Sequence, residues 1–202
     1  VTASDGTDSS TQNITVNVTN INDNTPSITS SSTFSAAENQ TSIGTVTATD
    51  ADGDTVTYSL SGTDASSMTI GSSSGVLAFS SAPDYETKSS YTATVTASDG
   101  TNSSTQSITV SITDVDDVAP AFTSSATFSA AENQISIGTV TATDVDSSSI
   151  SFSVSGSDLS ITSSGVLSFA SAPDYETKSS YTATVTASDG TNSSTQSITV
   201  NE

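Results

Sequence analysis

The stretch SAPDYETKSSYTATVTASDGTNSSTQSITV, residues 81–110, decides the fold of this chain, because it recurs without a change at 171–200. A second block, FSAAENQTSIGTVTATD at 34–50, returns at 128–144 with one substitution. Internal repeats of this length indicate copies of one domain arranged in tandem. The repeat is therefore the unit in which fold and function have to be interpreted.

The chain opens with VTASDGTDSSTQNITV, a near copy of 95–110, so its first residues match the end of a repeat. We therefore expect 1–22 to hold the last two strands of a preceding repeat, and 23–117 and 118–202 to be whole repeats. A hairpin of two strands is marginal in water and exposes its apolar face. We accordingly expect neighbouring copies or upstream sequence to complete the first sandwich.

Inside each repeat the apolar residues alternate with Thr and Ser. Tyr91, Ala93, Val95 and Ala97 are each separated by a Thr, and this period of two predicts half-buried strands. Turn signals such as ADGD and SDGTNSS separate the strands. The pattern predicts an all-β fold of tandem seven-stranded antiparallel Greek-key β-sandwiches with immunoglobulin-like architecture. In the first whole repeat we expect strands near 27–34, 42–49, 55–61, 67–70, 75–80, 89–98 and 104–113.

The charge of the chain excludes several classes of function. Its 202 residues include 22 acids but only two cations, Lys88 and Lys178, and the formal net charge is −20. No basic surface can neutralise nucleic-acid phosphates or dock on an anionic membrane, and no apolar run suggests membrane insertion. Because the chain has no His and no Cys, Ser and Thr lack an evident general base, and we do not expect an enzyme.

The acids gather in short motifs at loops. AEN, TDAD, PDYE and ASDG follow or precede the expected strands, and most of their acids return at matching places in the last repeat. Two connectors between repeats, NINDNTP at 20–26 and DVDDVAP at 114–120, each end in a proline. Solvated acidic loops are the plainer interpretation of such clusters. Against it, carboxylates about 4 Å apart repel by roughly 1 kcal/mol or more per pair, so crowding them calls for a cation.

The nature of the ligands favours calcium as that cation. Calcium is a hard ion that takes six to eight oxygen ligands, and dense carboxylates and carbonyls suit it. Zinc and copper prefer imidazole or thiolate, which this chain lacks. The residues thus favour calcium ions as the cofactor.

These motifs, in this order and spacing, resemble those of cadherin domains, and the resemblance covers essentially the whole chain. It implies calcium ions enclosed by carboxylates from the base of one sandwich, the connector, and the top of the next. At the second connector the implied ligands are Glu38, Asp84 and Glu86 from the base, Asp114, Val115, Asp116, Asp117 and Val118 from the connector, and Asp144, Asp146 and Asp189 from the top of the last repeat. Elsewhere the matching positions are Asn22, Asp23, Asn24, Asp50, Asp52, Asp99, Glu132, Asp174, Glu176 and Asp5.

The chain departs from the family pattern at a few positions. Asn20 stands where the family usually has Asp, and Asp116 replaces a usual Asn. Tyr85 and Tyr175 replace the usual Arg between the two acids of the base motif, which is not a ligand. The last repeat reads DVDSSS where the preceding one reads DADGDT, so its top loop is expected to present a carbonyl ligand differently.

We expect a calcium-rigidified structural or adhesive segment of a long extracellular or cell-surface protein or filament. Its expected partners are calcium ions and adjacent repeats or other copies of the same protein. The near-identity of adjacent repeats resembles large bacterial surface adhesins. The alternative is a carbohydrate- or protein-binding β-sandwich module, for which Tyr85 and Tyr175 are the candidate contacts. Sequons at 13–15, 17–19, 102–104 and 192–194 permit N-glycosylation.

Overall fold

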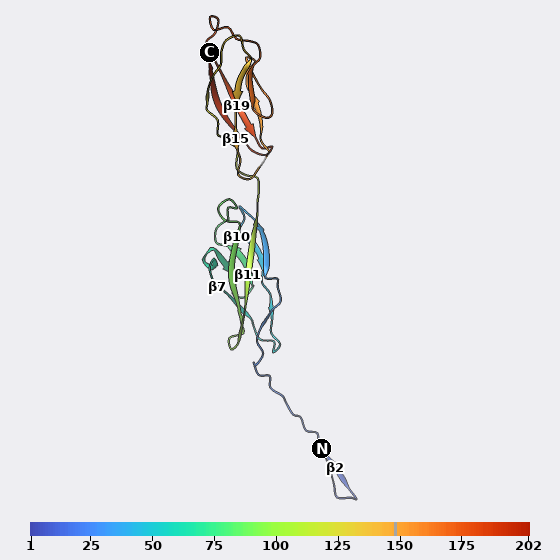
Figure 1. Cartoon of the computed structure of the whole chain (residues 1–202). Helices are drawn as coiled ribbons and strands as arrows, with labels where there is room; N and C mark the ends of the chain where they lie inside the picture. Colours follow the sequence, from blue (N-terminus) through green and yellow to red (C-terminus); the bar gives the residue numbers. More distant parts are fainter. Residues whose placement is uncertain (148) are drawn as a thin grey trace. The chain divides into compact units, whose positions relative to one another are not determined.

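The computed structural model describes residues 1–147 and 149–202, and almost all of its regular structure is β-strand (Figure 1). The expected difference in the top loop at 144–149 involves Ser148, which lies outside the described residues. By its internal contacts the chain divides into two units. The first contains 1–35, 41–81 and 90–111, and the second contains 36–40, 82–89 and 112–202, so the AEN and PDYE loops group with the connector that follows them.

The first whole repeat is built from two sheets and a short additional pair. The pair joins β3 (Ser27–Ile28) to β6 (Ala48–Thr49). A single 3-10 turn, η1 (Ala65–Ser67), follows β7. One sheet has the order β4 (Thr33–Ala37), β11 (Ser103–Thr113), β10 (Ser90–Ser98) and β7 (Thr57–Ser61), and the other has the order β5 (Ser42–Thr45), β9 (Val76–Phe79) and β8 (Met68–Ile70).

The last repeat has the same topology. Its short pair joins β12 (Ala121–Phe122) to β15 (Ala142–Thr143). Its sheets have the orders β13 (Thr127–Ser129), β20 (Ser193–Asn201), β19 (Ser180–Ser188) and β16 (Ser151–Val154), and β14 (Ser136–Thr139), β18 (Val166–Phe169) and β17 (Leu159–Ile161).

The predicted sandwich is confirmed, with two differences in detail. The strands expected at 27–34 and 42–49 are each divided, because β3 pairs with β6 whereas β4 belongs to the sheet of β11 and β5 to that of β9. The pairing also includes a parallel ladder. β13 runs parallel to β20, with Thr127 opposite Thr199, because the first and last strands of the repeat run in the same direction where they meet.

The core follows the alternation in the sequence. Along β10, Ala93, Val95 and Ala97 are buried, and β11 buries Ile108 opposite Ala93 and Val110 opposite Tyr91. The intervening Thr and Ser residues face outward, so one face of each sheet remains in solvent. The core of the last repeat contains the matching residues Val140, Leu159, Leu167, Phe169, Val185, Ile198 and Val200.

No Asp, Glu or Lys occurs in any strand found within 1–147 and 149–202. All charged side chains therefore lie in turns, loops, connectors and chain ends, and the strands present only uncharged side chains. Within the same residues, no helix is long and apolar enough to cross a membrane. The fold thus separates its charge from its sheets and collects it where the strands end.

Residues 1–20 form a hairpin and an extended segment. β1 (Thr2–Ser4) pairs only with β2 (Ser9–Thr11) in a two-stranded sheet. The side chains of Ile14, Val16 and Val18 are 62%, 79% and 93% exposed. Their counterparts in the near copy at 95–110 and its continuation, which include Ile108 and Val110, are core residues.

Two glycines of the last repeat test how tightly the turns are built. Gly165 has a φ of +91°, and a Cβ there would lie 2.3 Å from the carbonyl oxygen of Val140, whereas Gly156 has a φ of +86° with open space around it. We predict that Gly165→Ala lowers the free energy of unfolding by about 3 kcal/mol, because it adds a clash to the backbone strain. Gly156→Ala, which carries the strain alone, should cost about 1 kcal/mol. Urea denaturation of the two variants checks this, and equal losses would contradict the clash.

Candidate metal centres

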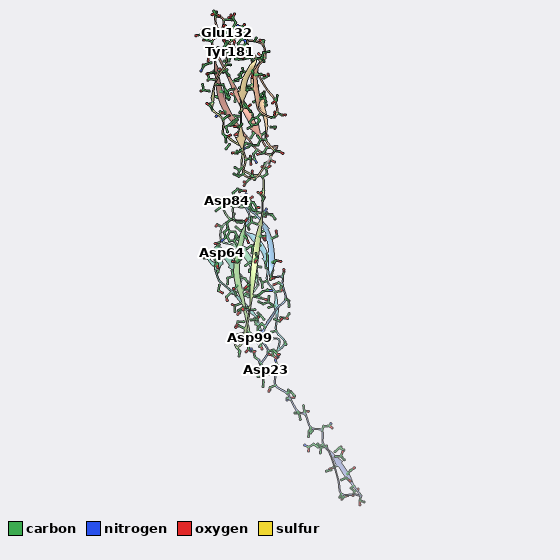
Figure 2. All side chains as sticks on the ribbon, viewed as in Figure 1. Asp23, Asp64, Asp84, Asp99, Glu132 and Tyr181 are labelled. Carbon is green, nitrogen blue, oxygen red and sulfur yellow. The ribbon has the colours of Figure 1, made fainter. Side chains whose placement is uncertain are left out.

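The first junction consists of the connector 20–26 and the loops of the following sandwich at 50–54 and 98–104. Asp52 accepts hydrogen bonds at Oδ2 from the backbone N–H groups of Asp23 (3.0 Å) and Asn24 (2.8 Å), and at Oδ1 from the Asn24 amide (2.7 Å). Asp50 and Asp99 each use Oδ1 to accept backbone N–H groups of their own loops. Figure 2 shows Asp23 and Asp99 at the same end of this sandwich.

The second junction consists of the connector 114–120 and the loops at 144–147 and 188–194, and it repeats this geometry. Asp146 Oδ2 accepts the N–H groups of Asp117 and Val118, both at 2.9 Å. Asp144 and Asp189 again use Oδ1 to accept N–H groups of their own loops. The two connectors differ in sequence, yet equivalent carboxylates, Asp52 and Asp146, accept N–H groups from equivalent connector positions.

The second oxygen of these carboxylates is what distinguishes the loops from ordinary turns. Five carboxylate oxygens at the two junctions are buried and have no hydrogen-bond partner among the described residues: Oδ2 of Asp50, Asp99, Asp144 and Asp189, and Oδ1 of Asp146. A buried charged oxygen without a donor is costly and rare in native proteins. The same arrangement recurs at both junctions, and a cation is a ligand that could complete it.

Asp144 and Asp146 influence each other's ionisation. The side-chain interaction with Asp146, together with burial, raises the pKa of Asp144, whereas the same interaction and the N–H group of Val118 lower the pKa of Asp146. At the first junction, hydrogen bonds from the Asn24 backbone and side chain instead hold the pKa of Asp52 below its ordinary value. A bound divalent ion would favour the ionised form of both Asp144 and Asp146.

The base of the first whole repeat contributes a separate group of acids. Glu38, Glu86 and Asp114 each place a carboxylate oxygen within 4.8 Å of the others. Glu38 is only 2% exposed, and its oxygens accept the N–H groups of Val115 (2.7 Å) and Tyr85 (2.9 Å). Burial of an ionised Glu is tolerated when its lone pairs are satisfied, and here the connector supplies one of the donors.

Glu86 is the member of this group whose pKa is raised. Its own backbone N–H lowers the pKa, but burial and the charges of Glu38, Asp114 and Asp84 outweigh that effect and raise it above the ordinary value. Neighbouring carboxylates thus resist ionisation of Glu86.

The base of the last repeat has the matching group. Glu132, Asp174 and Glu176 also place oxygens within 4.8 Å of one another, and all three are exposed. Burial, followed by the charges of these three acids, raises the pKa of Glu202. Both Glu202 oxygens are buried and lack a partner among residues 1–147 and 149–202.

The structure does not gather every residue that the sequence singled out. Asp84 uses both oxygens on Thr87 and stands outside the 4.8 Å group, while Asp5 caps the exposed β1–β2 turn alone. Val115 and Val118 expose their side chains, which is compatible with a ligand role for their backbone carbonyls alone. Asp54, which the sequence reasoning passed over, belongs to a group with Asp50 and Asp52. Its position two residues after Asp52 in DADGD was the available signal.

The donor set fits calcium. The ligand atoms are carboxylate and amide oxygens with carbonyls nearby, the geometry is open enough for several oxygens, and the orphaned atoms carry negative charge. The described part of the chain offers neither imidazole nor thiolate to a softer metal. The residues that would hold the ion at the second junction come from the base loops, the connector and the top loops.

Comparison with known proteins gives consistent matches. The Cadherin domain family model matches residues 32–113. Protocadherin Fat 4 of Mus musculus is 35% identical over 194 residues, and that of Homo sapiens is 32% identical over 201 residues, covering 85% and 89% of this chain. The chain spans about 4% of the length of these relatives.

Solved structures show the same fold. Mouse cadherin-23 EC22-24 matches with a TM-score of 0.74 at 26% identity, covering 90% of this chain and 65% of that one. Human protocadherin-24 EC1-2 matches with a TM-score of 0.74 at 20% identity, covering 90% of this chain and 98% of that one, and at this identity it supports the fold alone.

The raised pKa of Glu86 predicts a pH dependence in calcium-free buffer. A carboxyl whose folded pKa is above its unfolded value, near 4.5, stabilises the fold below that value and loses this contribution as pH rises through the folded pKa. We expect Glu86→Gln to remove this loss, so the variant becomes more stable relative to wild type as pH rises. Thermal unfolding from pH 4 upward measures the difference.

Asp84→Asn provides a control of opposite sign. Hydrogen bonds from the Thr87 side chain and backbone lower the pKa of Asp84, so its contribution is present above the unfolded value of 3.8 and lost as pH falls. Equal pH profiles for the two variants would contradict the assignment of repulsion to Glu86.

Proposed function

Since the repeats of this chain are cadherin-like domains, we propose that the protein is a calcium-rigidified structural and adhesive segment of a long extracellular surface protein or filament. The observation that carries this proposal is the set of buried, unpaired carboxylate oxygens that recurs at both junctions. Repeats of extracellular adhesion proteins are the family context of such loops, and the calcium requirement of this chain is our inference from its residues.

At each junction, backbone N–H groups orient the carboxylates, and the carboxylates supply the negative charge. Backbone N–H groups hold one oxygen of each top-loop carboxylate, which turns the other oxygen toward the place of the ion. Glu38 binds the start of the connector and Asp146 binds its middle, so the connector is held at two points. Calcium supplies the positive charge that offsets repulsion among these acids. The junction would then resist bending.

Assembly with further copies is the proposed use of this stiffness. The near-identity of the two repeats supports a long array, and a large bacterial surface filament remains our proposed context for it. The protocadherin gammaB7 EC3-6 structure is described as a cis-dimer, at 29% identity to this chain and with a TM-score of 0.71. We propose by analogy that adjacent repeats or other copies of this protein are its partners.

The binding-module alternative has less support. Ring pairs form inside the sandwiches, as between Phe79 and Tyr91 at 4.9 Å and between Phe169 and Tyr181 at 5.0 Å. No ring pair found in the described part of the chain includes Tyr85 or Tyr175, although Tyr175 is 52% exposed. Strand aromatics therefore serve the core, as the alternation predicted.

Calcium should stabilise the chain measurably. At ten times its dissociation constant, one site adds about 1.4 kcal/mol by mass action, and coupled sites add more. We expect a chelator to lower the melting temperature, and Asp117→Ala to remove most of the calcium-dependent shift of the second junction. Scanning calorimetry with and without calcium measures both effects.

Asp158→Ala is the matched control for Asp117→Ala. Asp158 pairs with Lys178 at 2.5 Å on the exposed surface, outside the acidic groups, so the variant loses the same charge but no expected ligand. Its calcium-dependent shift should equal that of wild type. A melting temperature that is insensitive to chelator in the wild-type chain would refute the proposal.

We also propose that residues 1–22 are the last two strands of a preceding repeat. A chain in which a copy of 23–94 is placed before Val1 should fold its first sandwich. Amides near Val16 should then become protected from hydrogen exchange, because Val110, the counterpart of Val16, is fully buried. The same fusion with Val16→Asp should stay unprotected. Equal exchange in the two fusions would show that the segment is not a sandwich strand.

A further inference from the structure

Asn192, in the turn before β20, and Ser194, in β20, both hydrogen-bond to the second connector. Asn192 Nδ2 donates to the Asp116 carbonyl oxygen at 3.1 Å and to Asp116 Oδ1 at 3.2 Å. The Ser194 hydroxyl donates to the carbonyl oxygen of Pro120. These contacts hold the connector at two points four residues apart, and neither involves a charge on the gripping residue.

The turn that carries Asn192 is itself fixed. Its backbone N–H donates to Asp189 Oδ1 at 2.6 Å, and its carbonyl accepts from the Ser188 hydroxyl at 3.1 Å. A side chain on so constrained a turn loses little freedom when it binds. Because Asp189 also carries one of the buried, unpaired oxygens, the turn sets the connector and a candidate ligand in one frame.

The first junction repeats the amide contact with a different connector sequence. Asn102 occupies the position of Asn192, and its Nδ2 donates to Asn22 Oδ1 and to the Asn24 carbonyl oxygen, both at 3.1 Å. The Asn102 backbone N–H likewise donates to Asp99 Oδ1 at 2.6 Å. The contact therefore depends on the turn and not on which acid or amide the connector presents.

We propose that Asn192 and Ser194 form a clamp that holds the connector on the last repeat independently of metal, and that Asn102 has the same role at the first junction. These are positioning residues. They keep the connector in place when its acids are uncompensated, so that less ordering is required when a cation binds. The proposal of a clamp is based on hydrogen bonds from uncharged side chains and does not depend on the proposed calcium function.

The clamp also gives a role to the sequence Asn-Ser-Ser at 192–194. A glycan on this sequon would be attached to Nδ2 of Asn192, the atom that makes both bonds to Asp116. Ser194, the hydroxyl residue of the sequon, is engaged by Pro120. A glycan would replace one of the two hydrogens on Nδ2, so at most one of the two bonds to Asp116 could remain.

The chain contains a natural variant that shows how to test the clamp. Asp8 stands at the corresponding position of the N-terminal hairpin, and its carbonyl still accepts from the Asp5 N–H (3.2 Å) and the Ser4 hydroxyl (2.9 Å). Asp is therefore compatible with the turn but lacks the amide donor. Asn192→Asp should keep the turn and lose the clamp.

Residue-resolved hydrogen exchange of the metal-free full chain tests this. In wild type the Asp117 and Val118 amides bind Asp146, and loss of the clamp should lower their protection about fivefold. The Asp23 and Asn24 amides of the first junction should not change. Asn201→Asp is the control for added charge, because the Asn201 side chain accepts a hydrogen bond from Ser180, as Asp also can.

Equal protection of Asp117 and Val118 in wild type and Asn192→Asp would overturn the clamp, and so would an equal fall in the Asn201→Asp control. Ser194→Ala, which adds no charge, should give a fall of about twofold or more. If Asn192→Asp also exposes amides of β19 and β20, Ser194→Ala decides the question, and unchanged protection in that variant would overturn the proposal.

Discussion

Repulsion among carboxylates at the junctions is the constraint on which the rest of the structure depends. Four junction carboxylates use Oδ1 to accept loop N–H groups, while their Oδ2 is buried without a partner among the described residues. They are Asp50, Asp99, Asp144 and Asp189. Such an arrangement is unfavourable unless an external charge completes it. In the function that we propose, a bound cation supplies this charge.

The division of charge between strands and loops follows from this constraint. The chain has a net charge of −20 and 32% hydrophobic residues, and the strands within 1–147 and 149–202 contain no charged residue. The uncharged Thr and Ser of the outer faces keep the sheets soluble without adding to the repulsion. Because the acids lie outside the strands, their mutual repulsion acts at the loops and connectors and not in the core.

Neutral amide side chains also bind the connectors at both junctions. Asn192 and Asn102 bind their connectors without adding charge, and Asn39 donates to Asp117 Oδ2 at 2.5 Å from the base side. Asn39 and its counterpart Asn133 both adopt a φ of 60°, a conformation that Asn tolerates better than most residues. The second connector is thus held by amide side chains at Asp116 and Asp117, and by the carboxylates of Glu38 and Asp146, which accept its own N–H groups.

The sequence by itself determined the presence of repeats, the alternating strands and the acidic motifs, because these depend on local pattern and on identity between copies. The burial of Val95 and Val110 followed from a period of two. Only the tertiary structure decided which acids meet: Glu38, Glu86 and Asp114 come together, Asp84 turns to Thr87, and Asp54 joins Asp50. It also decided the division of the first strands and the parallel β13–β20 ladder. Side-chain direction and strand pairing depend on contacts between residues far apart in the chain, and neither composition nor spacing encodes them.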